Sequence, residues 1–145
     1  MKKLFYIIMF LFCINTNVFA VDDTCKVKIE NISNKPTIVH EFFSCLEKRK
    51  FYALAPFCNS HLDFSFITEK NEYTERNTEY KCLDNLETLI NKVDYNRFKI
   101  TTGITKKGEE LIVASLYLYE DTDEFVVNIM LVLNHNCAIN RIIVF

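Results

Sequence analysis

The sequence predicts an α+β domain in which helices pack on an antiparallel sheet. Helical periodicity occurs early in the chain, and runs rich in β-branched and aromatic residues with short links follow it. Helices first and strands last is the order typical of the α+β class. A length of 145 residues suits one domain. The 14% of aromatic residues, with only 2 Gly and 2 Pro, exclude disordered, collagen-like and linker-like chains.

The first predicted helix begins near Pro36, which suits the first turn of a helix. The apolar residues that follow recur at the spacing of one helical face. They are Ile38, Val39, Phe42, Phe43 and Leu46. The basic residues Lys48, Arg49 and Lys50 fit a solvated helix end, where the helix dipole favours cations, with an anion site as the alternative. The pattern then predicts a short helix over 51–58, a strand over 62–67, a charged loop over 68–76 and a third helix over 77–92.

Four strands are predicted after the helices, over residues 97–102, 111–119, 125–133 and 139–145. Their links are short, so we expect an antiparallel meander. A sheet with one wet face alternates apolar and polar residues, but eight of the nine residues from Phe125 to Leu133 are apolar. We therefore expect the outer sheet face to be covered by a second copy of the chain or a protein partner. The alternative is that an N-terminal arm, residues 22–35, covers it.

The N-terminus has the pattern of a secretory signal. Lys2 and Lys3 precede a short apolar run that ends at Ile14, and a polar stretch then ends at Ala20. The run is shorter than the roughly 20 residues that span a bilayer, so we favour cleavage after Ala20 over an uncleaved anchor. No later stretch could span a membrane. We divide the chain into a signal peptide (1–20), an N-terminal arm (21–35) and one domain (36–145), and expect a periplasmic or secreted protein.

Export would place the protein in an oxidising compartment, where cysteines form disulfides. Those that remain after cleavage are Cys25, Cys45, Cys58, Cys82 and Cys137. Five cysteines in an oxidising compartment indicate structural disulfides with one thiol left over, and the sequence does not choose the pairing; inert core thiols are the alternative. Zinc ligation is disfavoured because no Cys-x-x-Cys or His-x-x-x-His spacing occurs. We expect neither a metal nor another cofactor, and the near-neutral charge disfavours a nucleic-acid partner.

Two segments resemble the nuclear transport factor 2-like superfamily, which includes ketosteroid isomerases and polyketide-cyclase-like proteins. The first is Val39–Cys58, where a Phe-Phe helix is followed by Leu54-Ala55-Pro56; the second is Asn136–Ile142. The resemblance covers about residues 36–145. It implies a curved, cone-like sheet around the helices, often with a conical pocket, and pairing through the outer sheet face in many members.

The resemblance does not extend to the isomerase chemistry. That chemistry needs a carboxylate to move a proton and a hydroxyl to stabilise an oxyanion. The family's tyrosine falls near Phe42 and its aspartate near Phe66. Asp63 lies three residues from Phe66, which places its side chain on the opposite face of a strand. We therefore lean against an enzyme.

Other catalytic or metal-binding constellations are weaker. A dyad of His61 with Asp63 could act as a base, and Cys45 or Cys58 with His40 could act as a nucleophile. His135 falls in a predicted hairpin turn, and the acidic run 120–124 could attract calcium. We interpret the histidines and the acidic run as surface features, and the cysteines as disulfide or core residues.

The strongest remaining feature is apolar. Five side chains could line a cone and hold a small apolar ligand: Phe42, Phe64, Phe66, Tyr117 and Met130. The alternative is that these side chains fill the core. We expect a non-catalytic ligand-binding or protein-interaction module. The alternatives are a small isomerase, lyase or cyclase with an unidentified catalytic group, and a scaffold in a bacterial envelope or secretion assembly.

Export predicts a specific mature N-terminus. Because signal peptidase would cleave after Ala20, intact-mass measurement of the protein from its source should show a chain that begins at Val21. A full-length chain that begins at Met1 would contradict the prediction.

Overall fold

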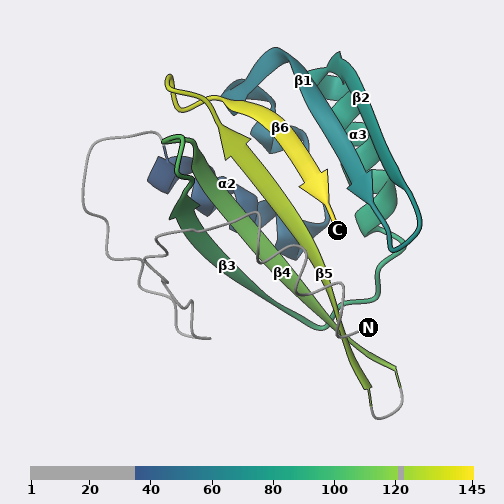
Figure 1. Ribbon diagram of the computed structural model, residues 1–145. Helices are drawn as coiled ribbons and strands as arrows, with labels where there is room; N and C mark the ends of the chain where they lie inside the picture. Colours follow the sequence, from purple (N-terminus) through teal and green to yellow (C-terminus); the bar gives the residue numbers. More distant parts are fainter. Residues whose placement is uncertain (1–34, 121–122) are drawn as a thin grey trace.

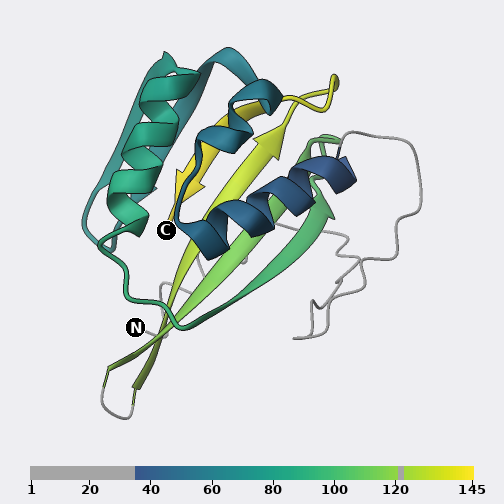
Figure 2. The same cartoon turned by 180° about the vertical axis from the view of Figure 1, so that it is seen from behind.

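The helices form one layer on one face of a six-stranded sheet (Figures 1 and 2). The computed structural model describes residues 35–120 and 123–145; the predicted signal peptide and residues 21–34 of the predicted arm lie outside this part. The elements are α2 (Lys35–Lys48), the 3-10 helix η1 (Tyr52–Phe57), β1 (Cys58–Ile67), β2 (Glu72–Thr78), α3 (Glu79–Ile90), β3 (Arg97–Ile104), β4 (Glu110–Glu120), β5 (Asp123–Leu133) and β6 (Ile139–Val144). The predicted α+β class is confirmed.

The sheet has the strand order β2-β1-β6-β5-β4-β3. Strands β3 to β6 form the predicted antiparallel meander. Strand β1 lies parallel to β6, with Phe64 opposite Ile142, so the sheet is mixed and the prediction of a wholly antiparallel sheet is corrected. A parallel pair needs a long connection between its strands, which β2, α3 and the rest of the meander supply.

The predicted charged loop over 68–76 is corrected, because β2 occupies most of it. Strand β2 pairs antiparallel with β1 and forms one edge of the sheet. Most of its side chains are exposed, and both of its faces are polar, so the sequence shows none of the alternation that marks a half-buried strand. Charged side chains on an edge strand hinder pairing with a further chain. This explains why β2 is rich in charged and polar residues although it is a strand.

The core lies between the helices and the inner face of the sheet. Helix α2 contributes the fully buried Ile38, Phe42 and Leu46, and α3 contributes Leu83 and Leu86. Burial of each such side chain stabilises the fold by about 1.5–3 kcal/mol. The apolar spacing predicted these two faces, and the helices that carry them fix which sheet face is the inner one.

The outer face of the sheet carries a second apolar cluster. Leu111, Met130 and Val132 are buried there. Val113, Ile143 and Phe145 pack against them, and we call these six residues the outer patch. The helices of the described part lie on the opposite face (Figure 2). The prediction that β5 is apolar on both faces is therefore confirmed.

Arg49 joins the ends of α2 and α3. It follows α2 with a φ of 55°, a left-handed conformation in which glycine is the usual residue. Its guanidinium donates to the carbonyls of Val93 (2.7 Å), Tyr95 (3.3 Å) and Ile90 (3.4 Å) and lies 4.2 Å from the centre of the Tyr95 ring. The last carbonyls of a helix lack partners within it, so Arg49 supplies donors where α3 ends. Arg49 is thus a structural residue, whereas Lys48 and Lys50 are exposed as expected.

A carboxylate ties the start of η1 to α3. Glu87 accepts from the Lys50 ammonium at 2.9 Å and from the Phe51 N–H at 3.1 Å. The hydrogen bond from Lys50 holds the pKa of Glu87 below its ordinary value. The Tyr52 hydroxyl also donates to Asp84 at 3.2 Å. These bonds fix the short helix against α3, which closes one side of the core.

Removal of the Arg49 side chain should destabilise the protein. We expect Arg49→Gly to lower the free energy of unfolding by about 1–3 kcal/mol, because charge-assisted hydrogen bonds are lost, although glycine relaxes the left-handed backbone. Urea denaturation measures the change. Lys48→Ala, which removes an exposed cation from the same helix end, is the control and should change stability by less than about 0.5 kcal/mol. An Arg49→Gly variant as stable as the control would contradict the role of the guanidinium.

Candidate functional site

The five predicted pocket residues lie on two faces of the sheet. Phe42 and Phe64 are buried in the main core, and Phe66 packs half-buried against it. Met130 belongs to the outer patch. Tyr117 also lies on the outer face, because neighbouring strand residues alternate in direction and the buried side chains beside it point inward. The five residues therefore do not line one pocket, and of them only Phe66 is a half-buried side chain on the inner face.

Five half-buried apolar side chains pack against the core on the inner face, and each comes from the part of its element nearer the end where the β4–β5 hairpin projects. They come from β1, α3, the α3–β3 connection, β4 and β5, and we call them the hairpin-end cluster: Phe66, Leu89, Val93, Leu118 and Val127. The Asn96 N–H donates to the Tyr117 carbonyl at 3.3 Å, which joins the α3–β3 connection to β4. Phe125, paired with Leu118, is 38% exposed at the same end.

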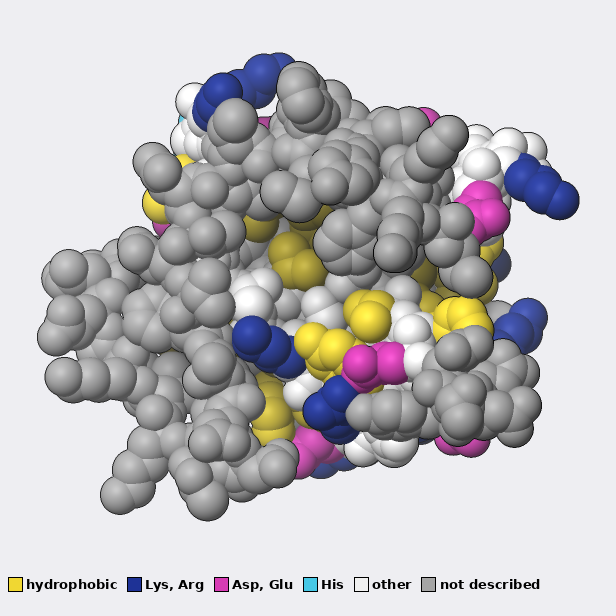
Figure 3. Space-filling model, turned by 60° about the horizontal axis from the view of Figure 1, so that its bottom comes forward, with side chains coloured by type: hydrophobic (Ala, Val, Ile, Leu, Met, Phe, Trp, Pro, Cys, Tyr) yellow, Lys and Arg dark blue, Asp and Glu magenta, His cyan; other side chains and the backbone are white. Residues whose placement is uncertain are grey.

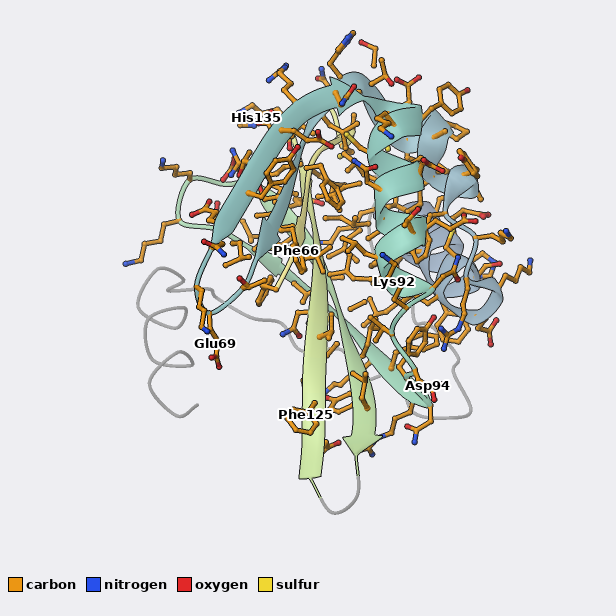
Figure 4. The ribbon with its side chains drawn as sticks, turned by 90° about the vertical axis from the view of Figure 1, so that its right-hand side faces the viewer. Phe66, Glu69, Lys92, Asp94, Phe125 and His135 are labelled. Atoms are coloured by element: carbon orange, nitrogen blue, oxygen red, sulfur yellow. The ribbon has the colours of Figure 1, made fainter. Side chains whose placement is uncertain are left out.

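Figure 4 shows how this end is arranged. Phe66 lies at the middle of the molecule, and Phe125 lies below it on β5. Lys92 and Asp94 lie on the connection between α3 and β3, and Glu69 lies on the turn between β1 and β2. Figure 3 brings this end of the molecule forward and shows hydrophobic side chains between basic and acidic ones. Of the labelled residues, Lys92, Asp94 and Glu69 are exposed charges.

Aromatic side chains support one side of the hairpin-end cluster. The Phe43 and Phe98 rings lie 5.1 Å apart, and the Tyr95 ring meets Phe98 edge-on at 6.2 Å. The Tyr95 hydroxyl donates to the Leu46 carbonyl in α2. Burial raises the pKa of Tyr95 above its ordinary value, so its hydroxyl stays neutral and keeps this bond. Rings packed in this way hold the side of the cluster rigidly.

The inner-face carboxylates at the two sides of the sheet are already engaged. On β2, Glu75 accepts from the Asn85 amide at 2.5 Å and from the Tyr73 hydroxyl at 2.8 Å. At the start of β4, Glu110 forms an ion pair with Lys35 at 3.6 Å. Neither carboxylate lies with the hairpin-end cluster. These two carboxylates are therefore engaged with other side chains, away from the hairpin-end cluster.

The candidate catalytic residues are placed apart from the inner face. Asp63 points to the outer face, as predicted, and pairs with Arg76 at 3.4 Å. His61 and His40 are exposed. His135 is exposed at the end of the sheet opposite Phe125 (Figure 4). The structure therefore does not assemble the weighed base or nucleophile around the apolar cluster.

The four cysteines of the described part are free thiols, and the predicted disulfide stays a prediction. Cys45 and Cys82 are buried, Cys58 and Cys137 are half-buried, and Cys25 lies outside the described residues. Cys82 Sγ donates to the Leu62 carbonyl at 3.6 Å. These thiols pack in or against the core as small apolar side chains. Burial raises the pKa of Cys58 to about 12 and those of Cys45 and Cys82 to about 11.

Two further findings apply to the described part of the chain. No group of three or more His, Cys, Asp or Glu side chains there is placed to hold a metal ion. The acidic run 120–124 lies partly outside it. None of the helices described is long and apolar enough to cross a membrane.

Designed proteins share this arrangement of helices and sheet. The designed protein of "An enumerative algorithm for de novo design of proteins with diverse pocket structures" superposes with a TM-score of 0.54 at 6% identity, over 77% of this chain and 97% of its own. A variant of the design Rd1NTF2_05 with five substitutions superposes with a TM-score of 0.52 at 11% identity, over 77% and 96%. No protein-family model and no curated protein matches the sequence. These likenesses show a nuclear transport factor 2-like fold, and at such identities they show the fold alone.

The buried thiols should react slowly. At pH 8, a rise of two pKa units lowers the thiolate fraction roughly 100-fold, so Cys45, Cys58 and Cys82 should be alkylated at least that much more slowly in the folded protein than in urea. Mass spectrometry of peptides after timed iodoacetamide treatment measures each rate. Rapid labelling of these three thiols in the folded protein would contradict their burial.

The same thiols give a pH dependence of stability. Their folded-state pKa values lie above the ordinary value of 9.0, so the folded chain binds more protons than the unfolded chain above pH 9. The free energy of unfolding should therefore be unaffected by these groups below pH 9 and fall between pH 9 and about 12. Urea denaturation across this range measures the fall, which should shrink in Cys58→Ala.

Proposed function

We propose that this chain is an exported, non-catalytic binding module that holds a small apolar ligand at the hairpin-end cluster. The observation that carries the proposal is the cluster itself, in which half-buried apolar side chains from several elements meet at one end of the inner face. Ligand sites in proteins are lined mainly by hydrophobic and aromatic side chains. Export rests on the signal-like residues 1–20.

The chemistry of the cluster favours an uncharged ligand. Phe66, Leu118 and Val127 provide apolar contacts from three strands. The Lys92 and Asp94 side chains at the rim are exposed, so they would meet the solvent-facing end of a bound molecule. A charged ligand inside the cluster would lose its hydration without a partner, which is costly.

The placement of polar groups argues against the enzyme alternative. An isomerase, lyase or cyclase needs a positioned group that moves a proton. By the resemblance, the family's hydroxyl donor and carboxylate fall near Phe42 and Phe66, neither of which has such a group. The carboxylates Glu75 and Glu110 are engaged elsewhere. Binding without chemistry is the function that this arrangement supports best.

A second candidate is a protein-interaction module or envelope scaffold that acts through the outer patch. Its apolar character favours this use. However, Leu111 is 1% exposed in the single chain, and Met130 and Val132 are each 4% exposed. Side chains so well covered offer little surface to a partner, so we rank this candidate second.

A ligand screen tests the proposed function. Thermal unfolding with a panel of apolar probes (saturated fatty acids of 8–18 carbons, a steroid and a carotenoid) should find at least one that raises the melting temperature, because a ligand bound only by the folded state stabilises it. The effective probe should bind Phe66→Ser at least about tenfold more weakly, since the lost ring contact is worth roughly 1.4 kcal/mol or more.

The matched control is Ile67→Ser, the next residue on the same strand. Ile67 is half-buried like Phe66, but its side chain points to the other sheet face. Binding should be unchanged in this variant. No stabilising probe, or equal loss of binding in both variants, would overturn the assignment of the site.

A further inference from the structure

We propose that residues 21–34 of this chain lie across the outer patch and form its cover. The starting observation is that three outer-patch side chains are buried although they lie on the sheet face opposite the helices. Leu111, Met130 and Val132 point away from α2, η1 and α3, yet they are only 1–4% exposed within one chain. Layers that pack face to face bury the side chains between them, so burial to this degree on a sheet face favours a covering layer.

The described elements do not supply that layer. The helices of the described part lie on the inner face (Figure 2). The strands all belong to the one sheet that carries the patch. A cover from the same chain must therefore come from outside residues 35–120 and 123–145, and the long segment outside them precedes Lys35.

The entry point of that segment favours this occupant. Lys35, the first residue of α2, lies 3.6 Å from Glu110 as an ion pair. Glu110 is the chain neighbour of Leu111, which is the member of the outer patch at the start of β4. The chain before Lys35 thus begins on the inner face, at the end of the sheet where Leu111 lies on the opposite face.

The length of the segment is sufficient. Extended chain spans about 3.3 Å per residue, so residues 21–34 reach roughly 45 Å. The patch extends over three neighbouring strands, β4, β5 and β6, which are separated by about 5 Å each. The segment can leave the start of α2, turn around the end of the sheet and still cross all three strands.

The sequence of the segment has the matching chemistry. Cys25, Val27 and Ile29 alternate with Lys26 and Lys28. In an extended conformation, this alternation places the apolar side chains on one side and the ammonium groups on the other. The apolar side would pack on the outer patch, and the lysines would face water.

The decisive experiment is a direct contact measurement on the protein with residues 21–145 present. Methyl-selective NMR should show cross-peaks from Val27 and Ile29 to the Met130 methyl group in a monomer. Isotope-filtered spectra of a mixed labelled and unlabelled sample assign each contact to one chain or to two. Contacts within one chain support the proposal. Contacts only between chains, or none from the arm to Met130, overturn it.

Paired variants give an independent readout. Val27→Asp with Ile29→Asp should lower the melting temperature by about 5–10 °C and make the protein bind a hydrophobic dye, because the patch is uncovered. The matched control is Lys26→Ser with Lys28→Ser, which changes the other side of the same alternation and should leave both readouts unchanged. Equal effects of the two pairs, or a particle of twice the mass in the unmodified protein, would contradict the arm as the cover.

Discussion

The structure depends on the contact between the Arg49 guanidinium and the backbone that follows α3. A helix end leaves carbonyls without partners, and here one side chain from the end of α2 donates to Ile90, Val93 and Tyr95. Arg49 adopts a left-handed backbone conformation, which destabilises a residue other than glycine by roughly 1–2 kcal/mol. Its persistence there indicates that the three hydrogen bonds and the Tyr95 ring contact outweigh the strain. The two long helices are thereby locked together at the end where the hairpin-end cluster lies.

The sheet imposes the second constraint, because it is apolar on both faces. The helices pack on its inner face and bury the apolar side chains there. Its outer face carries Leu111, Met130 and Val132, and such a patch left open would favour association. Polar pairs limit the extent of this face: Ser115 donates to Asn128 at 2.8 Å, and Asp63 pairs with Arg76 at the β1–β2 side. The inner face therefore carries the main core, and the outer face carries the patch for which we propose a cover.

The sequence predicted those parts of the fold that have a strong local period. The stripes of α2 and α3 and the four-strand meander follow from spacing and turns alone. Strand β2 was missed because neither of its faces is apolar. The parallel pairing of β1 with β6 joins segments far apart in the chain, and no local pattern encodes it.

The candidate site was predicted less well, for a related reason. In β4 and β5 the side chains on both faces are apolar, so the alternation of apolar and polar residues could not show which face is the inner one. Tyr117 and Met130 face outward. Leu118 and Val127 face inward. In β1 the polar Asp63 lies between apolar residues, so the sequence showed which side chains face outward. The outward direction of Asp63 was predicted correctly. Arg49 was interpreted as part of a solvated helix end, because its carbonyl partners come into reach only after α3 docks.

Val93 links the Arg49 contact between α2 and α3 to the proposed ligand site. The Val93 carbonyl accepts from Arg49, while the Val93 side chain belongs to the hairpin-end cluster. Tyr95, two residues on, holds Arg49 on its ring and supports the Phe98 and Phe43 rings. A molecule bound at the cluster would therefore contact a segment whose backbone is already fixed, and little ordering entropy would be lost on binding. The arginine that joins the two helices therefore also fixes the backbone beside the apolar end of the inner face, where we propose that a ligand binds.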